Sequence, residues 1–379
     1  MRFRLFYHAW SSCWNHGNAH FLRGVARQLV GLGHEVRVHE PAGGWSRRNA
    51  LAEGGAAVLA EAEHLVPGVE LRSYHWPSID LDEALDGADV VLVHEWTEPA
   101  LVAAIGRQRA RGAPFLLFFH DTHHRAVTAP DDIAALDLDG YDAVLAFGES
   151  LREVYAARGW GARAVTWHEA ADTALFRPDR RAARDRDLVW IGNWGDGERS
   201  REIREFLIEP AARLGLRTSV HGVRYPDEAR AALAAAGIAY EGWLPNHRTP
   251  AVLRCAGATV HIPRRPYSAA LAGIPTIRVF EALACGVPLV CARWQDTEDL
   301  FGPGCFLSAR DGAAMTQALA LLRNEPAAGR ELAAAGLKSI RARHTCADRV
   351  AQLLAVIDRL QLRPVAPRPG VAVDGAAAP

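Results

Sequence analysis

The sequence predicts an α/β protein of two domains, each a parallel β-sheet with helices on both faces. Short apolar segments that are typical of buried strands alternate along the chain with segments of helical periodicity. The alternation stops at a polar, proline-terminated stretch, residues 164–179, and then restarts. The 379 residues, of which 49% are hydrophobic, suffice for two cores of roughly 170 to 190 residues each. We therefore place the domains at 1–170 and 171–345.

The first domain begins with a β-α-β unit. It comprises a strand at 3–9, a helix at 18–32 and, after a glycine turn, a strand ending at 39. The further elements are a helix at 48–64, a strand at 69–75, a helix at 81–85, a strand at 89–94, a helix at 98–111, strands at 115–119 and 142–147, and a helix at 150–158. Strands joined through helices pair in parallel by right-handed crossovers, so this order predicts one parallel sheet.

The second half repeats this alternation. We expect strands at 187–191, 217–222, 258–262 and 289–292, a strand and loop at 238–245, and helices at 200–213, 226–236, 248–255, 313–323 and 326–343. A last helix is expected at 347–360. Residues 363–379 are mostly proline, alanine, glycine and valine and show no periodicity. We therefore expect this tail to be disordered.

Composition excludes several classes of partner. The chain has 43 basic and 44 acidic residues, so a net charge of −1 gives no general attraction to nucleic acid or to an anionic membrane. Six cysteines without a Cys-x-x-Cys pair indicate buried thiols in a reducing compartment. The sequence shows no signal-peptide pattern and no apolar run of about 18 residues, as a transmembrane helix needs. We expect a cytoplasmic protein.

The most informative stretch is residues 273–288, GIPTIRVFEALACGVP. Thr276 marks a helix start and Gly286 its end, and an apolar strand follows. Arg278 and Glu281 are three residues apart and share a helical face, where a carboxylate among apolar residues needs a partner. Two interpretations stay open. Glu281 pairs with Arg278 alone, or its oxygens bind the two hydroxyls of a ribose while Arg278 and the helix N-terminus bind a diphosphate.

The segment RVFEALACGVPLV resembles the donor-binding signature of group 1 glycosyltransferases with the GT-B fold, in which two Rossmann-like domains face each other across a cleft. The resemblance covers about residues 1–360, and DTALFRP at 172–178 matches the family's interdomain Asp-x-x-x-Phe-x-Pro. It implies that Glu281 holds the nucleotide ribose. Many members carry a second Glu where this chain has Gly273, which points to a divergent branch, the spore-maturation-protein-like glycosyltransferases.

The resemblance also implies an activity. The expected reaction is transfer of a sugar from a nucleoside-diphosphate sugar to an acceptor, which the sequence does not specify as saccharide, protein or small molecule. By family analogy we expect retention of the anomeric configuration, no metal ion and no cofactor. The C-terminal helix, 346–362, is expected to pack back on the first domain.

Further donor-binding candidates lie in the second domain. Gly192 and Asn193 belong to a glycine turn between a strand and a helix, which suits a diphosphate, and Arg199 or Arg201 adds positive charge. Surface arginines commonly face solvent, so the choice between the two stays open. Trp243 follows a strand at the place where family members hold the nucleobase, although a plain core position is an equal alternative.

In the first domain, the loop with His16, Gly17 and Asn18 follows the first strand. Gly17 permits a close turn and Asn18 is a good helix N-cap, so this loop is a candidate for contact with acceptor and diphosphate; the alternative is an ordinary turn. His168 and Glu169 lie in the interdomain segment, at the lip of the cleft or in a hinge.

His120 and Asp121 are the catalytic candidates. His120 follows the apolar strand 115–119 and is expected to emerge at the carboxyl edge of the sheet, where Asp121 orients its ring. By family analogy, a His here lies beside the donor sugar. A zinc site with His123 and His124 lacks a fourth ligand at recognisable spacing, and we expect no metal.

Two other functions remain as alternatives. A Rossmann oxidoreductase would need a Gly-x-Gly-x-x-Gly turn after the first strand, and the sequence lacks one. A non-catalytic nucleotide-sugar-binding or scaffold protein is compatible with Gly273 in place of the familiar Glu. Donor hydrolysis or transfer assays separate these possibilities.

Overall fold

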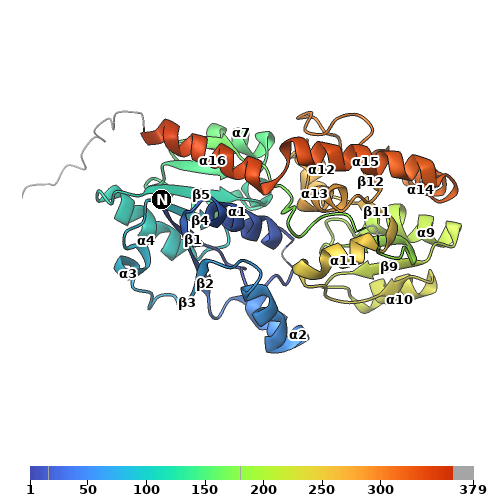
Figure 1. Cartoon of the computed structure of the whole chain (residues 1–379), viewed down its shortest axis with the longest axis horizontal. Coiled ribbons are helices and arrows are strands. Elements are labelled where there is room, and N and C mark those ends of the chain that lie inside the picture. The colour runs from blue at the N-terminus through green and yellow to red at the C-terminus, as the bar shows by residue number, and fades with distance from the viewer. Residues whose placement is uncertain (16, 180, 362–379) are drawn as a thin grey trace, which may run out of the picture.

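The computed structural model describes residues 1–15, 17–179 and 181–361. Within these residues, two parallel β-sheets lie side by side, each covered by helices (Figure 1). The predicted two-domain Rossmann-like fold is therefore confirmed. The tail predicted to be disordered, 363–379, lies outside the described residues, and the domain limits at 170 and 345 stay predictions.

The first sheet has the strand order β3-β2-β1-β4-β5-β6-β7. Its strands are β1 (Arg2–Phe6), β2 (Glu35–Pro41), β3 (Val69–Tyr74), β4 (Val90–His94), β5 (Leu116–Asp121), β6 (Ala143–Ala146) and β7 (Ala164–Thr166). The helices are α1 (Ala19–Gly31), α2 (Trp45–Glu63), α3 (Leu81–Leu85), α4 (Pro99–Ala110), α5 (Arg125–Thr128), α6 (Pro130–Ala134) and α7 (Glu149–Arg158). Central β4 and β5 are buried along their whole length, as expected of continuous apolar runs in a parallel sheet.

The second sheet has the order β10-β9-β8-β11-β12-β13. Its strands are β8 (Arg186–Ile191), β9 (Thr218–His221), β10 (Ala239–Tyr240), β11 (Ala256–His261), β12 (Leu289–Ala292) and β13 (Leu307–Ala309). The helices are α8 (Ser200–Ile203), α9 (Glu209–Leu214), α10 (Asp227–Ala235), α11 (Thr249–Arg254), α12 (Arg265–Ala269), α13 (Ile277–Ala284), α14 (Gly312–Asn324), α15 (Pro326–Arg343) and α16 (Cys346–Gln361), with a 3₁₀ turn, η2 (Asn246–Arg248).

Some elements differ from the prediction. The helix expected at 200–213 is interrupted by a π-helical turn, η1 (Arg204–Ile208), because Pro210 has no N–H to donate and α9 restarts around it. The first strand ends at Phe6 rather than at residue 9. β7, β13, α5, α6 and α12 are too short to show a clear period in the sequence.

The C-terminal helix crosses from the second domain to the first. In Figure 1, α15 lies over the second sheet, and α16 continues over the first, beside α1. Cys346 packs against Phe21 and Gly24 of α1, and a side chain at Gly24 would collide with its sulfur. Trp167 Nε1 donates to the Arg349 carbonyl at 2.8 Å. The apolar core is continuous from β1 through α16 into α13.

Candidate active site

A cavity of about 200 Å³ lies between the two domains at the carboxyl ends of both sheets. This is where open α/β sheets bind ligands, because the loops after the strands meet there. Of the site residues predicted from the sequence, the cavity is lined by Gly17, Asn18, Glu169, Gly192, Asn193, Arg199, Trp243, Thr276 and Arg278. It is also lined by residues that were not predicted, among them Trp96, Thr122, His123, Asn246, Arg264 and Tyr267.

Arginines gather on the second-domain wall. Arg199 donates to Asn193 O at 2.8 Å and to Asn193 Oδ1 at 2.6 Å, and Arg264 reaches the same Oδ1 at 3.2 Å. Asn193 thus holds two guanidinium groups in place, and a side chain at Gly192 would crowd Arg199. Burial, followed by the charge of Arg264, lowers the pKa of Arg199 to about 9. Two cations that share one cavity favour an anionic ligand between them.

The structure distinguishes the two candidate arginines. Arg199 lines the cavity, whereas Arg201 is exposed and lies in a separate surface depression with Trp194. The prediction that left Arg201 as a diphosphate ligand is therefore not supported by its position. Arg264 was not predicted. It follows β11 and lies at the carboxyl edge of the second sheet. The reasoning applied to His120, that residues after an apolar strand reach this edge, would have identified it.

Helix α13 directs its N-terminus into the cavity. Thr276, Ile277 and Arg278 all line it. Thr276 occupies the N-cap position, but its hydroxyl lies 3.1 Å from His261 Nε2 rather than capping the first turn. The backbone N–H of Ile277 instead faces the Glu169 carboxyl. Backbone donors and the helix dipole here add to the positive potential of the arginines.

Glu281 lies beneath this wall and is 1% exposed. Its carboxylate pairs with Arg278, accepts a hydrogen bond from Asn246 Nδ2 at 3.1 Å and lies 3.2 Å from His20 Nδ1. Burial alone would raise the pKa of Glu281, but the Arg278 charge and the His20 contact outweigh it and the pKa is lowered. The pairing with Arg278 is thus present. Contact with a ribose stays a prediction, since Glu281 is not among the described residues that line the main cavity.

Gly273 is fixed by its surroundings. Its φ of +86° favours glycine, and a Cβ at this position would collide with the hydroxyl of Thr297. A Glu side chain at this position, which the family resemblance led us to look for, does not fit this backbone.

The expected position of His120 is wrong. Strand β5 continues to Asp121, so His120 still pairs with its neighbours in the sheet and is fully buried. Its ring contacts Phe21 and Trp167, on the face that packs against α1. Neither His120 nor Asp121 belongs to the described residues that line the cavity. The sequence places the strand end too early because polar His120 and Asp121 interrupt the apolar run.

Asp121 points to the other face of the sheet, where its carboxylate accepts from Tyr155 OH at 2.7 Å and from the backbone N–H of His123 at 2.9 Å. The first residues past the strand end are Thr122 and His123, and both reach the cavity. Asp121 therefore fixes the start of the loop that carries His123.

Thr122 connects the loops of the first-domain wall. Its hydroxyl donates to Glu95 Oε1 at 3.0 Å and accepts from Asn18 Nδ2 at 2.6 Å. We had expected the Asn18 side chain to cap α1. It does not, because its amide donates to the Thr122 hydroxyl instead. Gly17 approaches Ile277 of the opposite domain so closely that a side chain would clash. His16, also predicted here, lies outside the described residues.

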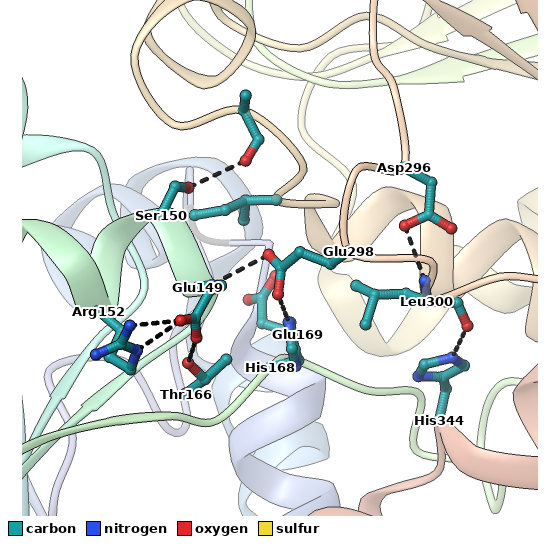
Figure 2. A network of polar contacts seen from close by, with 12 residues as sticks. Glu149, Ser150, Arg152, Thr166, His168, Glu169, Asp296, Glu298, Leu300 and His344 are labelled. Carbon is teal, nitrogen blue, oxygen red and sulfur yellow. Dashed lines mark hydrogen bonds and ion pairs between the residues drawn. The ribbon is translucent and has the colours of Figure 1, made fainter.

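The two linker candidates, His168 and Glu169, point in different directions. His168 Nε2 lies 2.8 Å from Glu298 Oε2 in a polar network outside the cavity (Figure 2). Glu298 also accepts from the backbone N–H of Glu149, at the start of α7, and so joins the domains. Glu169 is 4% exposed and lines the cavity. Burial, followed by the charge of Glu281, raises its pKa to about 8.

Comparison with protein families assigns both halves of the chain. Residues 17–175 match the model described as Glycosyltransferase Family 4, and residues 199–355 match the model described as glycosyl transferase-like. The chain is a GT-B glycosyltransferase. No curated protein sequence matches this glycosyltransferase.

Solved structures share its fold over nearly the whole length. Sucrose-phosphate synthase from Thermosynechococcus elongatus is 15% identical with a TM-score of 0.66, over 95% of this chain and 99% of that one. Anabaena HepE in complex with UDP and glucose is 12% identical with a TM-score of 0.65, over 94% and 99%. A DNA-modifying β-glucosyltransferase, solved with and without uridine diphosphoglucose, is 14% identical with a TM-score of 0.61, over 94% and 100%.

The described residues of the glycosyltransferase hold neither a candidate membrane span nor a cluster of metal ligands. None of its helices there combines the length and apolarity needed to cross a membrane. Three or more His, Cys, Asp or Glu side chains do not gather anywhere in that part as ligands for a metal ion.

Proposed function

We propose that this glycosyltransferase transfers a sugar from a nucleoside-diphosphate sugar to an acceptor whose identity stays open. The observation that carries the proposal is the interdomain cavity, in which Arg199, Arg264 and Arg278 lie beside the N-terminus of α13. Arginine forks and helix N-termini are the groups that bind diphosphate in proteins. The complex of Anabaena HepE with UDP and glucose, on the same fold, supports this choice of ligand.

The same groups suit the chemistry of transfer. Negative charge grows on the departing diphosphate as the bond to the sugar breaks, and preorganised cations stabilise it. Glu281 keeps Arg278 in place and is proposed to bind the ribose. Trp243, which lines the cavity, is proposed to hold the nucleobase. On the opposite wall, His123 and Trp96 face the space left for sugar and acceptor, and we transfer the catalytic proposal from His120 to His123. Retention stays a family analogy.

A screen of UDP-, GDP- and dTDP-sugars by thermal shift, followed by donor hydrolysis and transfer assays, tests the proposal. Arg264→Met should weaken donor binding about tenfold or more, since charge-assisted hydrogen bonds to the diphosphate are lost. Arg201→Met is the matched control, because Arg201 is an exposed arginine outside the cavity. Equal losses in the two variants, or no binding of any donor to the wild type, would contradict the proposal.

Metal independence forms part of the proposal, because arginine charge can take the place of a divalent cation at the diphosphate. Turnover should therefore be unchanged by EDTA. Loss of turnover that Mn²⁺ or Mg²⁺ restores would count against this. The spore-maturation-protein-like branch and a cytoplasmic location rest on the sequence alone and stay proposals.

A further inference from the structure

Glu169 is held in place by the C-terminal helix. Arg349 of α16 donates from Nε to the carbonyl of His168 at 2.9 Å and to that of Glu169 at 3.3 Å. Trp167, two residues before Glu169, donates back to the Arg349 carbonyl. These bonds fix the linker at Trp167, His168 and Glu169 itself, so the direction of the Glu169 side chain is set before any ligand arrives.

That side chain points into the proposed diphosphate site. Its carboxyl group faces the Ile277 N–H at the start of α13 and the side chain of Asn18. These are positions from which a diphosphate oxygen would also receive hydrogen bonds. In Figure 2, Glu169 lies next to His168, but none of the interactions drawn for Glu298 and Glu149 reaches its side chain. Linker residue Glu169 therefore serves the cavity rather than the interdomain network.

The charges around Glu169 do not balance an ionised carboxylate. On α13, the Arg278 charge lowers the pKa of Glu169, but Arg278 is already paired with Glu281, and the repulsion between Glu281 and an ionised Glu169 is the larger effect. His20 of α1 is in contact with Glu281, and Tyr267, next to the cavity, has a pKa raised well above its usual value by burial. A diphosphate would add further negative charge at the same place. Protonation of Glu169 removes the repulsion and supplies an O–H donor.

We propose that Glu169 enters the donor complex as a neutral carboxylic acid and donates a hydrogen bond to the diphosphate of the nucleotide sugar. The inference rests on the proposed function, since the diphosphate is the ligand assigned there to this cavity. Donor binding is then linked to the protonation of Glu169. Because its pKa is about 8, the Glu169 carboxyl group is largely protonated in the free enzyme at neutral pH.

The test is the pH dependence of donor affinity. UDP-, GDP- and dTDP-glucose carry a diphosphate diester that does not titrate between pH 6.5 and 8.5, so calorimetric Kd values in this range report the protein. If only the protonated enzyme binds, the wild-type Kd should rise about fourfold from pH 6.5 to 8.5. Glu169→Gln, a neutral isostere, should show a Kd that changes far less. The lowered pKa of Arg199, about 9, affects both proteins alike and mainly above this range.

Glu298→Gln is the control, because it removes a neighbouring carboxylate of the linker network that lies outside the cavity. It should keep the wild-type dependence. A second measurement needs no variant: at pH 8, binding heats in buffers of different ionisation enthalpy should reveal uptake of about half a proton by the wild type.

Equal pH dependence in wild type and Glu169→Gln, or binding without proton uptake, would overturn the role of Glu169 while leaving donor binding intact. Absence of binding of all three nucleotide sugars to wild type and variant at every pH would overturn the proposed function, and the role of Glu169 with it.

Discussion

Glu169 and Glu281 are both buried near the start of α13, yet their surroundings shift their pKa values in opposite directions. Glu281 has Arg278, Asn246 and His20 around its oxygens, and its pKa is lowered. Burial, followed by the charge of Glu281, raises the pKa of Glu169, although Asn18, Arg278 and the Ile277 N–H act in the other direction. A carboxylate beside a paired cation stays ionised, whereas one beside another carboxylate holds its proton. The ion pair of Glu281 thus helps to keep Glu169 neutral.

Glu281→Ala should weaken nucleotide binding by about 2 to 3 kcal/mol, the scale of lost charge-assisted hydrogen bonds. Arg278 loses the partner that orients it, and the proposed ribose contact disappears. The variant should also melt at a lower temperature, because Asn246 and His20 lose a buried partner. Calorimetry with a nucleotide sugar measures the first effect. Unchanged donor affinity would exclude both the ribose contact and the positioning of Arg278.

His120 lies near the end of β5 and His123 in the loop that follows, so His120→Ala and His123→Ala form a matched pair. His120 packs among Phe21, His94 and Trp167, so its removal leaves a void and should lower the melting temperature. His123 lines the cavity, and its removal should lower turnover by roughly 10² at a nearly unchanged melting temperature. The reverse pattern, with turnover lost only in a stable His120→Ala, would restore the catalytic assignment that the sequence suggested.

At the scale of elements, hydrophobic patterns located most strands and helices but not their ends. The apolar run 115–119 identified β5, yet hydrogen bonding to β4 and β6 carries the strand two polar residues further. Tertiary pairing decides such ends, and a local pattern does not contain it. The π-helical turn before Pro210 is a similar case, since the sequence shows the proline but not how the ladder adjusts to it.

Helix α16 contributes its Arg349 to the linker, and this contact can be tested. Arg349 is 2% exposed and donates to two linker carbonyls, so Arg349→Met would leave buried acceptors without partners. The free energy of unfolding should fall by about 2 to 4 kcal/mol. Arg349→Lys, which keeps the charge without the guanidinium fork, should recover only part of it. Denaturant unfolding measures both, and a loss below about 0.5 kcal/mol would show that Arg349 does not hold the linker.

At the scale of the molecule, the site is assembled from segments that the sequence keeps far apart. Asn18 meets Thr122, and Asn246 donates to the Gly17 carbonyl across 229 positions. Motifs predicted Gly192, Asn193, Arg199 and Arg278 of the second-domain wall, because glycine turns and helix starts are local patterns, but they did not predict Asn246, Arg264 and Tyr267. The contact of Asn18 with Thr122 and the approach of Arg264 to Arg199 depend on the order of the strands within each sheet. The contact of Asn246 with Gly17 depends on how the two domains meet. Periodicity encodes neither.

The stability of the whole molecule should depend on pH in both directions. Burial is the first cause that lowers the pKa of several histidines, among them His39, His124 and His344 to about 4 and His261 to about 3. The unfolded chain takes up these protons near pH 6.5, before the folded protein does, so stability should fall as the pH drops from about 6.5 towards 4. Glu169 acts in the opposite sense, because its raised pKa costs stability as the pH rises from about 4.5 to 8.

His344 isolates one contribution to the acid branch. Its Nε2 lies 2.6 Å from the Leu300 carbonyl (Figure 2). Its Nδ1 lies 2.9 Å from Arg349 Nη2, so the neutral ring donates at Nε2 and accepts at Nδ1. A proton on Nδ1 would face the guanidinium and break this contact. His344→Gln should therefore melt below the wild type at pH 8, where the contact is intact, and the difference should shrink as the pH falls from 6.5 to 4. Calorimetric melting curves across this range measure the difference, and a constant offset between the two proteins would contradict the role of His344 in acid sensitivity.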